Sequence, residues 1–262
     1  MITIQKYIRV QSLEEAWELN QKKNNRILGG MLWLKMGRAN VNTAIDLCDL
    51  GLEKIEESDD AFSIGTSVTL RQLEMHKGLN TYTCGAVREA LSSIVGVQFR
   101  NMATIGGSIW GRFGFSDVLT VFLTMDCYVE LYKGGIVPLP DFAVMKRDRD
   151  LLVRLIVKKT PAKFVYTSMR NQRTDFPVLA CGVGYVNDEY RVSVGARPGQ
   201  AMLLRDTDGI LANGISLSAS DAFAAFAAEA IPTGSNVRAS AAYRTHLIRV
   251  LVSRALTELG GL

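Results

Sequence analysis

Two pairs of adjacent glycines, each directly after an apolar segment, place the strongest constraint on how this chain folds and what it binds. The first pair is Gly29-Gly30 and the second is Gly106-Gly107. Glycine lets the backbone approach a ligand closely, and successive N–H groups in such turns point into a concavity that suits phosphate oxygens. Two such turns in successive α+β units can hold one diphosphate from opposite sides.

Taken alone, either pair is more often an ordinary turn than a ligand-binding loop, as we expect for Gly134-Gly135. No Walker lysine follows either pair and GxGxxG is absent, which disfavours a P-loop or a Rossmann fingerprint. Asp117 begins a predicted helix beyond the second pair and has two open interpretations. Its carboxylate binds a ribose or another hydroxyl, or it is a helix-start charge that the helix dipole favours.

Composition excludes several classes of protein. Of the 262 residues 48% are apolar and 21% charged, which indicates a globular chain. The net charge of +4 is spread along the sequence, so nucleic acid is not expected as the main ligand. The 2 histidines lie far apart and the 4 cysteines form no CxxC pair, so neither a metal or iron–sulfur site nor a disulfide framework is predicted. Without a signal peptide or an 18-residue apolar run, we expect a cytoplasmic protein with no membrane span.

Short strands and helices alternate in the first part of the chain, and a run of strands followed by two helices closes it. Capping boxes begin at Ser12 and Thr69, and Ser116 caps a third predicted helix. The closing strands include 151–159, and the last helix covers about 235–258. These patterns predict an α+β fold. The predicted divisions are two α+β subdomains over about 1–56 and 57–155, and a separate α+β domain over 156–262.

Six segments carry a resemblance to a known family that spans nearly the whole chain. ILGGMLWLKM stands where the family has an AGGT(D/S) loop, FSIGTSVTLRQLE matches IGAxxTLxxLE, and QFRNMATIGGSIWG matches QIRNxATxGGN, the most specific of the six. SDVLTVFLTMDCYVEL, VPLPDF and RASAAYRTHLIRVLVSRAL match SADxxPxLxALDAxVEL, VPLxDF and SxxYRxHLxxVLxxRAL. In this order the segments resemble the FAD-binding (medium) subunit of the molybdenum hydroxylases, such as xanthine dehydrogenase, carbon monoxide dehydrogenase and nicotinate dehydrogenase.

The resemblance implies an oxidoreductase subunit with a two-part FAD-binding region like that of the vanillyl-alcohol oxidase superfamily, plus a C-terminal α+β domain. The pyrophosphate of FAD would lie on the two glycine loops. Such subunits assemble with a small [2Fe–2S] subunit and a large molybdopterin subunit. Electrons pass from a substrate hydroxylated at molybdenum through the clusters to FAD, which reduces NAD or another acceptor.

Carried over position by position, the resemblance assigns cofactor binding to the two loops and to the aspartate beyond them, and it assigns no catalytic residue. The assigned residues are Leu28, Gly29, Gly30, Met31, Leu32, Ala103, Thr104, Ile105, Gly106, Gly107, Ser108 and Asp117. Ser108 replaces the usual asparagine, and both Thr104 and Ser108 bring a hydroxyl donor.

Several departures from the family pattern favour a second hypothesis, a non-catalytic assembly subunit of the same fold that has lost tight FAD binding. Met31 and Leu32 stand where the family has threonine and a polar residue, so hydroxyl contacts are lost while backbone N–H groups remain. Thr167 stands at the position of a lysine that family members carry near the flavin. A free-standing flavin oxidase is a weaker third hypothesis, because no residue is placed to activate a substrate.

The second glycine loop yields a direct test. We expect Gly107→Val to abolish flavin retention, because the added side chain occupies the path of the pyrophosphate. The flavin content of the purified variant, read from its absorption spectrum, checks this expectation. Normal flavin content in a folded variant would refute the assignment of the loop.

Overall fold

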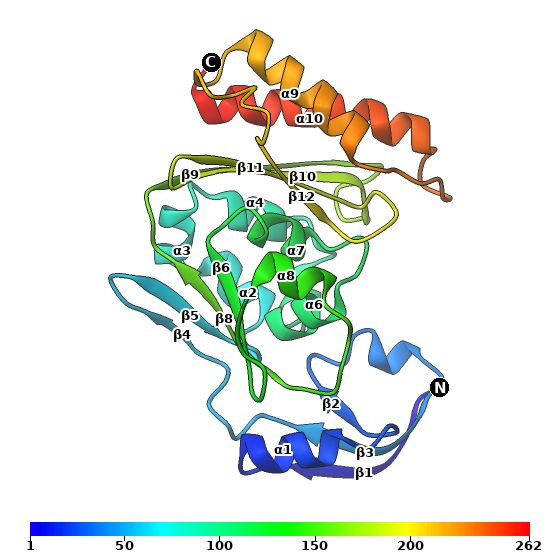
Figure 1. Ribbon diagram of the computed structural model, residues 1–262. Helices are drawn as coiled ribbons and strands as arrows, with labels where there is room; N and C mark the ends of the chain where they lie inside the picture. The colour runs from blue at the N-terminus through cyan, green and yellow to red at the C-terminus, as the bar shows by residue number, and fades with distance from the viewer. The chain divides into compact units, whose positions relative to one another are not determined.

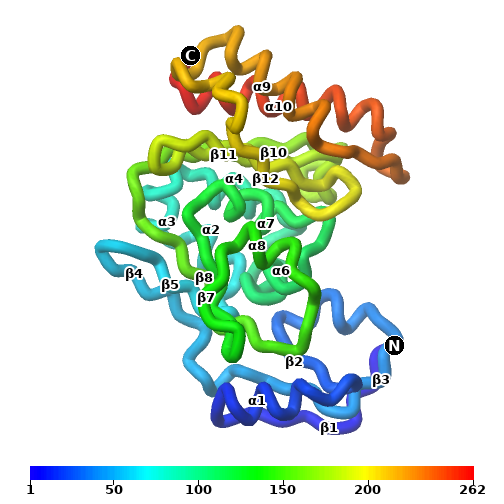
Figure 2. The backbone as a smooth tube through the Cα atoms, viewed as in Figure 1, coloured from blue at the N-terminus to red at the C-terminus, as the bar shows by residue number.

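The computed structural model describes all 262 residues, which divide into two compact units. The chain passes between the units several times, and its path can be followed by colour in Figure 2. The first unit comprises Met1–Gln72, Val97–Gly111 and Cys127–Val157. The second unit comprises Leu73–Gly96, Arg112–Asp126 and Lys158–Leu262. Neither unit is therefore a single stretch of sequence.

A small parallel sheet forms one part of the first unit (Figure 1). Its strands, in spatial order, are β1 (Thr3–Arg9), β3 (Asn40–Asp46) and β2 (Arg26–Leu28). Helix α1 (Leu13–Asn20) lies along this sheet and begins as predicted, because the Oγ of Ser12 accepts the N–H of Glu15. Ala16, Ile45 and Leu151 belong to one buried cluster, so the small sheet packs against the chain near residue 151.

A five-stranded sheet completes the first unit, in the order β4-β5-β8-β6-β7. Its strands are β4 (Ile55–Glu57), β5 (Ala61–Gly65), β6 (Cys127–Leu131), β7 (Gly135–Pro138) and β8 (Leu152–Lys158). The hairpin predicted at Gly134-Gly135 is confirmed, since β6 and β7 pair antiparallel and Gly135 has a φ of 70°. The sequence pattern groups β8 with the later strands, but β8 lies between β5 and β6 because Val153, Leu155 and Val157 are buried in this sheet.

A four-stranded antiparallel sheet forms the second unit, in the order β12-β11-β10-β9. Its strands are β9 (Ala162–Arg170), β10 (Pro177–Val186), β11 (Glu189–Gly195) and β12 (Met202–Arg205). A tight turn joins β10 to β11, and Asn187 and Asp188 both have positive φ, as a two-residue hairpin turn requires. Helices α9 (Leu217–Ala230) and α10 (Ala241–Gly260) lie side by side on one face (Figure 1).

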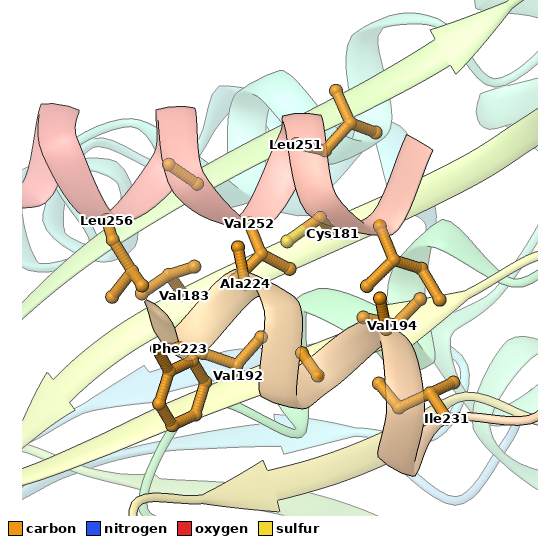
Figure 3. Packing of buried hydrophobic residues seen from close by; sticks show 14 of the residues in the cluster. Cys181, Val183, Val192, Val194, Phe223, Ala224, Ile231, Leu251, Val252 and Leu256 are labelled. Carbon is orange, nitrogen blue, oxygen red and sulfur yellow. The ribbon is translucent and has the colours of Figure 1, made fainter. Parts of the chain in front are cut away.

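The core of the second unit lies between the sheet and this helix pair. Figure 3 shows Cys181 and Val183 of β10 meeting Phe223 and Ala224 of α9 and the apolar side chains of α10. Helices α4 (Ala86–Ser92) and α7 (Asp117–Phe122) contact β9, β10 and β11 as well, so β10 is buried along nearly its whole length. Burial raises the pKa of the Cys181 thiol to about 12, which keeps it protonated and unreactive.

The remaining helices are short, and two of them, α2 and α7, begin after the capping residues that the sequence predicts. They are η1 (Leu34–Met36), α2 (Leu70–Met75), α3 (Lys77–Tyr82), α4 (Ala86–Ser92), α5 (Val97–Arg100), α6 (Ile105–Gly111), α7 (Asp117–Phe122) and α8 (Leu139–Val144). Both bonds of the capping box between Thr69 and Gln72 are present, and Ser116 caps α7. The Nδ1 of His76 accepts the N–H of Leu79 and so caps α3. No helix has both the length and the apolar character required to cross a bilayer.

The last helix begins at Ala241, later than predicted, because a buried arginine holds the preceding loop in another conformation. Arg244 is 1% exposed, and its guanidinium donates to the carbonyl groups of Val178, Gly234 and Ala239 and to the Oδ1 of Asn236. These bonds tie the loop before α10 to strand β10. The cation is thus neutralised by oxygen dipoles in the absence of a carboxylate.

Removing this guanidinium should destabilise the second unit. We expect Arg244→Ala to lower the free energy of unfolding by about 3 to 5 kcal/mol, because it leaves buried carbonyl groups unpaired and opens a void. Urea unfolding followed by circular dichroism measures the change. Arg249→Ala, on the exposed side of the same helix, is the matched control and should stay within about 0.5 kcal/mol of the wild type. Equal effects of the two substitutions would contradict the assigned role of Arg244.

Candidate functional site

The first glycine loop follows β2 and presents a run of backbone donors that have no acceptor in the chain. These donors are the N–H groups of Gly29, Gly30, Met31 and Leu32. Met31 has a φ of 61°, in the left-handed region that a non-glycine residue rarely adopts. A left-handed residue in a turn helps successive N–H groups converge on an anion. The loop therefore keeps free backbone donors, although its side chains at Met31 and Leu32 are apolar.

The second glycine pair differs from the predicted turn, because Gly106 and Gly107 lie in the first turn of helix α6. The second glycine loop, 103–108, therefore uses its backbone donors inside the protein. The N–H groups of Ile105 and Gly106 donate to backbone carbonyls of the segment after β5, at 2.8 and 2.9 Å. The N–H of Gly107 donates to the Oγ1 of Thr104 at 3.1 Å, and the Oγ of Ser108 donates to the carbonyl of Thr104. The Thr104 hydroxyl, which accepts one bond and keeps its own proton, is the donor that this loop retains for a ligand.

Two of the glycines allow the loops to touch their neighbours directly. A Cβ on Gly30 would lie 1.8 Å from the carbonyl oxygen of Met102, and a Cβ on Gly106 would lie 1.8 Å from the Oγ1 of Thr66. No side chain fits at either position. Gly107 differs, because a Cβ there would meet only the Oγ1 of Thr104, at 3.2 Å. Gly107 is thus the position where a side chain can be added without a collision between backbones.

One cavity of about 330 Å³ in the first unit is lined by both loops. Its volume is at the lower end of the range for small-molecule sites, so it accommodates part of a dinucleotide. Five of the predicted residues line it, namely Leu28, Gly29, Thr104, Gly106 and Gly107. The other predicted loop residues, Gly30, Met31, Leu32, Ala103, Ile105 and Ser108, belong to the same two loops but do not line the cavity.

The cavity also has lining residues that sequence reasoning missed. They are hydroxyl, aromatic, amide and charged side chains, including Thr66, Trp110, Asn20, Asn25, Arg26 and Arg149. The segment 20–26 resembles an ordinary polar loop after a helix, and the charged stretch around residue 149 resembles a solvated connection. No short-range signal marks either segment, because they meet only when the chain folds.

Asp117 lies in the second unit, where its carboxylate is engaged by the chain itself. The Oδ1 of Asp117 accepts hydrogen bonds from the hydroxyl of Tyr166 and the Nη2 of Arg170. Burial raises the pKa of the Asp117 carboxyl, although the positive charge of Arg170 opposes the shift. The Nη1 of Arg170 donates to the carbonyl of Asp175, whose carboxylate faces Arg238 at 3.4 Å. The bonds of Asp117 join α7 to β9.

Comparison with solved structures confirms the predicted fold class. Quinoline 2-oxidoreductase from Pseudomonas putida 86 superposes with a TM-score of 0.87 at 18% identity, covering 98% of this chain and 96% of the other. Reconstituted CO dehydrogenase from Oligotropha carboxidovorans gives a TM-score of 0.87 at 22% identity, covering 99% and 98%.

Two relatives are similar over nearly their whole length. An uncharacterised protein of Escherichia coli K12, YgfM, is 26% identical over 255 residues, which cover 95% of this chain and 94% of the relative. The alpha subunit of the 6-hydroxypseudooxynicotine dehydrogenase complex of Paenarthrobacter nicotinovorans is 25% identical over 280 residues, covering 96% and 93%.

Family models account for most of the sequence. The model of the CO dehydrogenase flavoprotein C-terminal domain matches residues 164–259. The model of the FAD binding domain in molybdopterin dehydrogenase matches residues 2–160, which include both glycine loops and every residue that lines the cavity. The chain therefore belongs to the molybdopterin dehydrogenase FAD-binding family, whose members are flavoprotein subunits of molybdenum-containing oxidoreductases.

Proposed function

We propose that this chain is the FAD-binding electron-transfer subunit of a molybdenum hydroxylase complex in the cytoplasm. Its partners are a large molybdopterin subunit and a small [2Fe–2S] subunit, and electrons pass from the clusters through FAD to NAD or another acceptor. When bound, FAD supplies the redox chemistry that the side chains of this chain lack. The relative from Paenarthrobacter nicotinovorans is a subunit of a dehydrogenase complex, which supports a role in an assembly.

The observation that carries the proposal is the single cavity lined by both glycine loops. The first loop contributes the unbonded N–H of Gly29 and the second contributes the Thr104 hydroxyl, and both residues line the cavity, so donors from two distant parts of the sequence belong to one site. Phosphate oxygens accept such bonds, and backbone donors need no side chain to do so. These residues fit the diphosphate of a dinucleotide.

We extend the proposal to the functions of the individual domains. Residues 1–155 act as the FAD-binding domain, in two subdomains of about 1–56 and 57–155, and residues 156–262 act as the C-terminal domain. The two family models, which meet between residues 160 and 164, support this division. The resemblance assigns Asp117 to cofactor binding, and here we assign it to the anchoring of α7 through Tyr166 and Arg170.

The absorption spectrum of the purified protein tests the proposal directly. We expect flavin bands in the protein fraction, either on purification or after incubation with FAD and desalting. Bands that remain with the protein support the electron-transfer role. A colourless protein that does not bind added FAD would instead favour the assembly subunit that has lost tight FAD binding. Met31 and Leu32 would then be the first residues to substitute.

The hydroxyl of Thr104 should contribute measurably to FAD affinity. We expect Thr104→Val to weaken FAD binding about tenfold, because a charge-assisted hydrogen bond is lost while the shape of the side chain is retained. Titration of the flavin-free protein with FAD, followed by flavin fluorescence, measures the dissociation constant. Thr104→Ser keeps the hydroxyl and should bind within about twofold of the wild type. Wild-type affinity in the valine variant would exclude Thr104 from the site.

A further inference from the structure

Two arginines meet at the wall of the cavity, and one backbone oxygen is shared between them. The Nη1 of Arg26 donates to the carbonyl of Asn25 at 2.8 Å, and the Nη2 of Arg149 donates to the same oxygen at 3.2 Å. The two guanidinium groups therefore lie side by side, although they are far apart in the sequence. Both residues line the cavity that the glycine loops also line.

Neither guanidinium has a carboxylate partner. Arg26 donates to the carbonyls of Lys23 and Asn25, and Arg149 donates to carbonyls of the segment 20–25. The pKa of Arg149 is lowered, first by burial and then by the adjacent charge of Arg26, as expected for two cations held together. The repulsion between two positive charges at close range destabilises the unliganded site. An anion bound between the two guanidinium groups and the glycine loops would offset this repulsion.

The acidic residues that line the same wall, Asp148 and Asp150, accept hydrogen bonds from backbone N–H groups and form no ion pair with the two arginines. The carboxylate of Asp150 accepts the backbone N–H groups of Lys133, Gly134 and Leu151. The carboxylate of Asp148 accepts the N–H of Asp150. Asp150 thus stabilises the turn of the β6–β7 hairpin, and Asp148 stabilises the backbone just before β8. Their hydrogen bonds run to backbone donors, and the charge of the arginine pair is left without a direct partner.

The arginine pair keeps donors for a ligand. The Nε and Nη2 of Arg26 and the Nη1 of Arg149 have no acceptor in the chain and are not among the buried atoms without a partner. Planar guanidinium groups with free N–H donors match the oxygens of phosphate esters. Asn20 and Gln21 donate in turn to the carbonyl of Arg149, so the pair is held in place from both sides.

On the basis of the proposed function, we propose that the Arg26–Arg149 pair binds the diphosphate of FAD and supplies the charge that the glycine loops of this chain cannot. Met31 and Leu32 lack the hydroxyl donors that are usual for the first loop. The N–H groups of the second loop donate to acceptors within the chain. The affinity for the dinucleotide consequently depends on the two cations, and a free diphosphate ester such as ADP competes for the same subsite.

Arg26 is the better residue to substitute, because Arg149 also anchors the segment 20–25 through three carbonyl groups. We expect Arg26→Gln to weaken the binding of FAD and of ADP to the flavin-free full chain by ~10- to 100-fold, since a charge-assisted phosphate contact is lost. The dependence of affinity on salt concentration becomes shallower in this variant, because one charge no longer contributes. Arg26→Lys keeps the charge and the salt dependence but loses part of the affinity.

The matched control is Lys23→Gln, which removes the same charge from an exposed position of the same loop that does not line the cavity. It should change FAD affinity less than twofold, and thermal melting of each flavin-free variant verifies the fold. FAD and ADP affinities of Arg26→Gln equal to those of the wild type, or a salt dependence unchanged despite weaker binding, would overturn the proposal. Wild-type protein that binds ADP but not FAD would refute the proposed function and leave the arginine pair as a diphosphate site.

Discussion

The first unit depends on backbone contacts that only glycine permits. The carbonyl of Met102 occupies the space where Gly30 would carry a side chain, and the side chain of Thr66 occupies the corresponding space beside Gly106. These contacts bring β2, the turn after β5 and helix α6 to one place. Three segments that are distant in the sequence then form one wall of the cavity. The wall forms because glycine lets the backbones of these segments come into direct contact.

The two loops, which look alike in the sequence, do different work in the fold. The second loop is a packing element whose N–H groups complete the hydrogen bonds of the neighbouring segment. The first loop is left with unbonded donors and with a strained residue, Met31, in a left-handed conformation. Strain of this kind persists where the surrounding structure holds it in place, and it is often found at ligand-binding positions. The first loop therefore keeps its free backbone donors, although Met31 and Leu32 carry no hydroxyl.

Local patterns predicted the elements that begin at a capping residue, but they could not predict which distant segments lie together. Capping residues such as Ser12, Thr69 and Ser116 act within one helical turn, so their signal is contained in a few neighbouring residues. The assignment of β8 failed for the opposite reason, because its pairing partners come from much earlier segments. Arg26 and Arg149 illustrate the same limit, since nothing near either residue shows that they share the carbonyl of Asn25.

The interleaving of the two units has a consequence for dissecting this protein. A fragment cut at residue 160, where the first family model ends, would contain all of the five-stranded sheet. It would also contain α4 and α7, which pack on β9, β10 and β11 and would lose those strands. Apolar side chains of α7 such as Val118, Val121 and Phe122 are almost fully buried in the intact chain. Released from their sheet, they would make the excised piece prone to aggregate, so the units of sequence similarity are not units of autonomous folding.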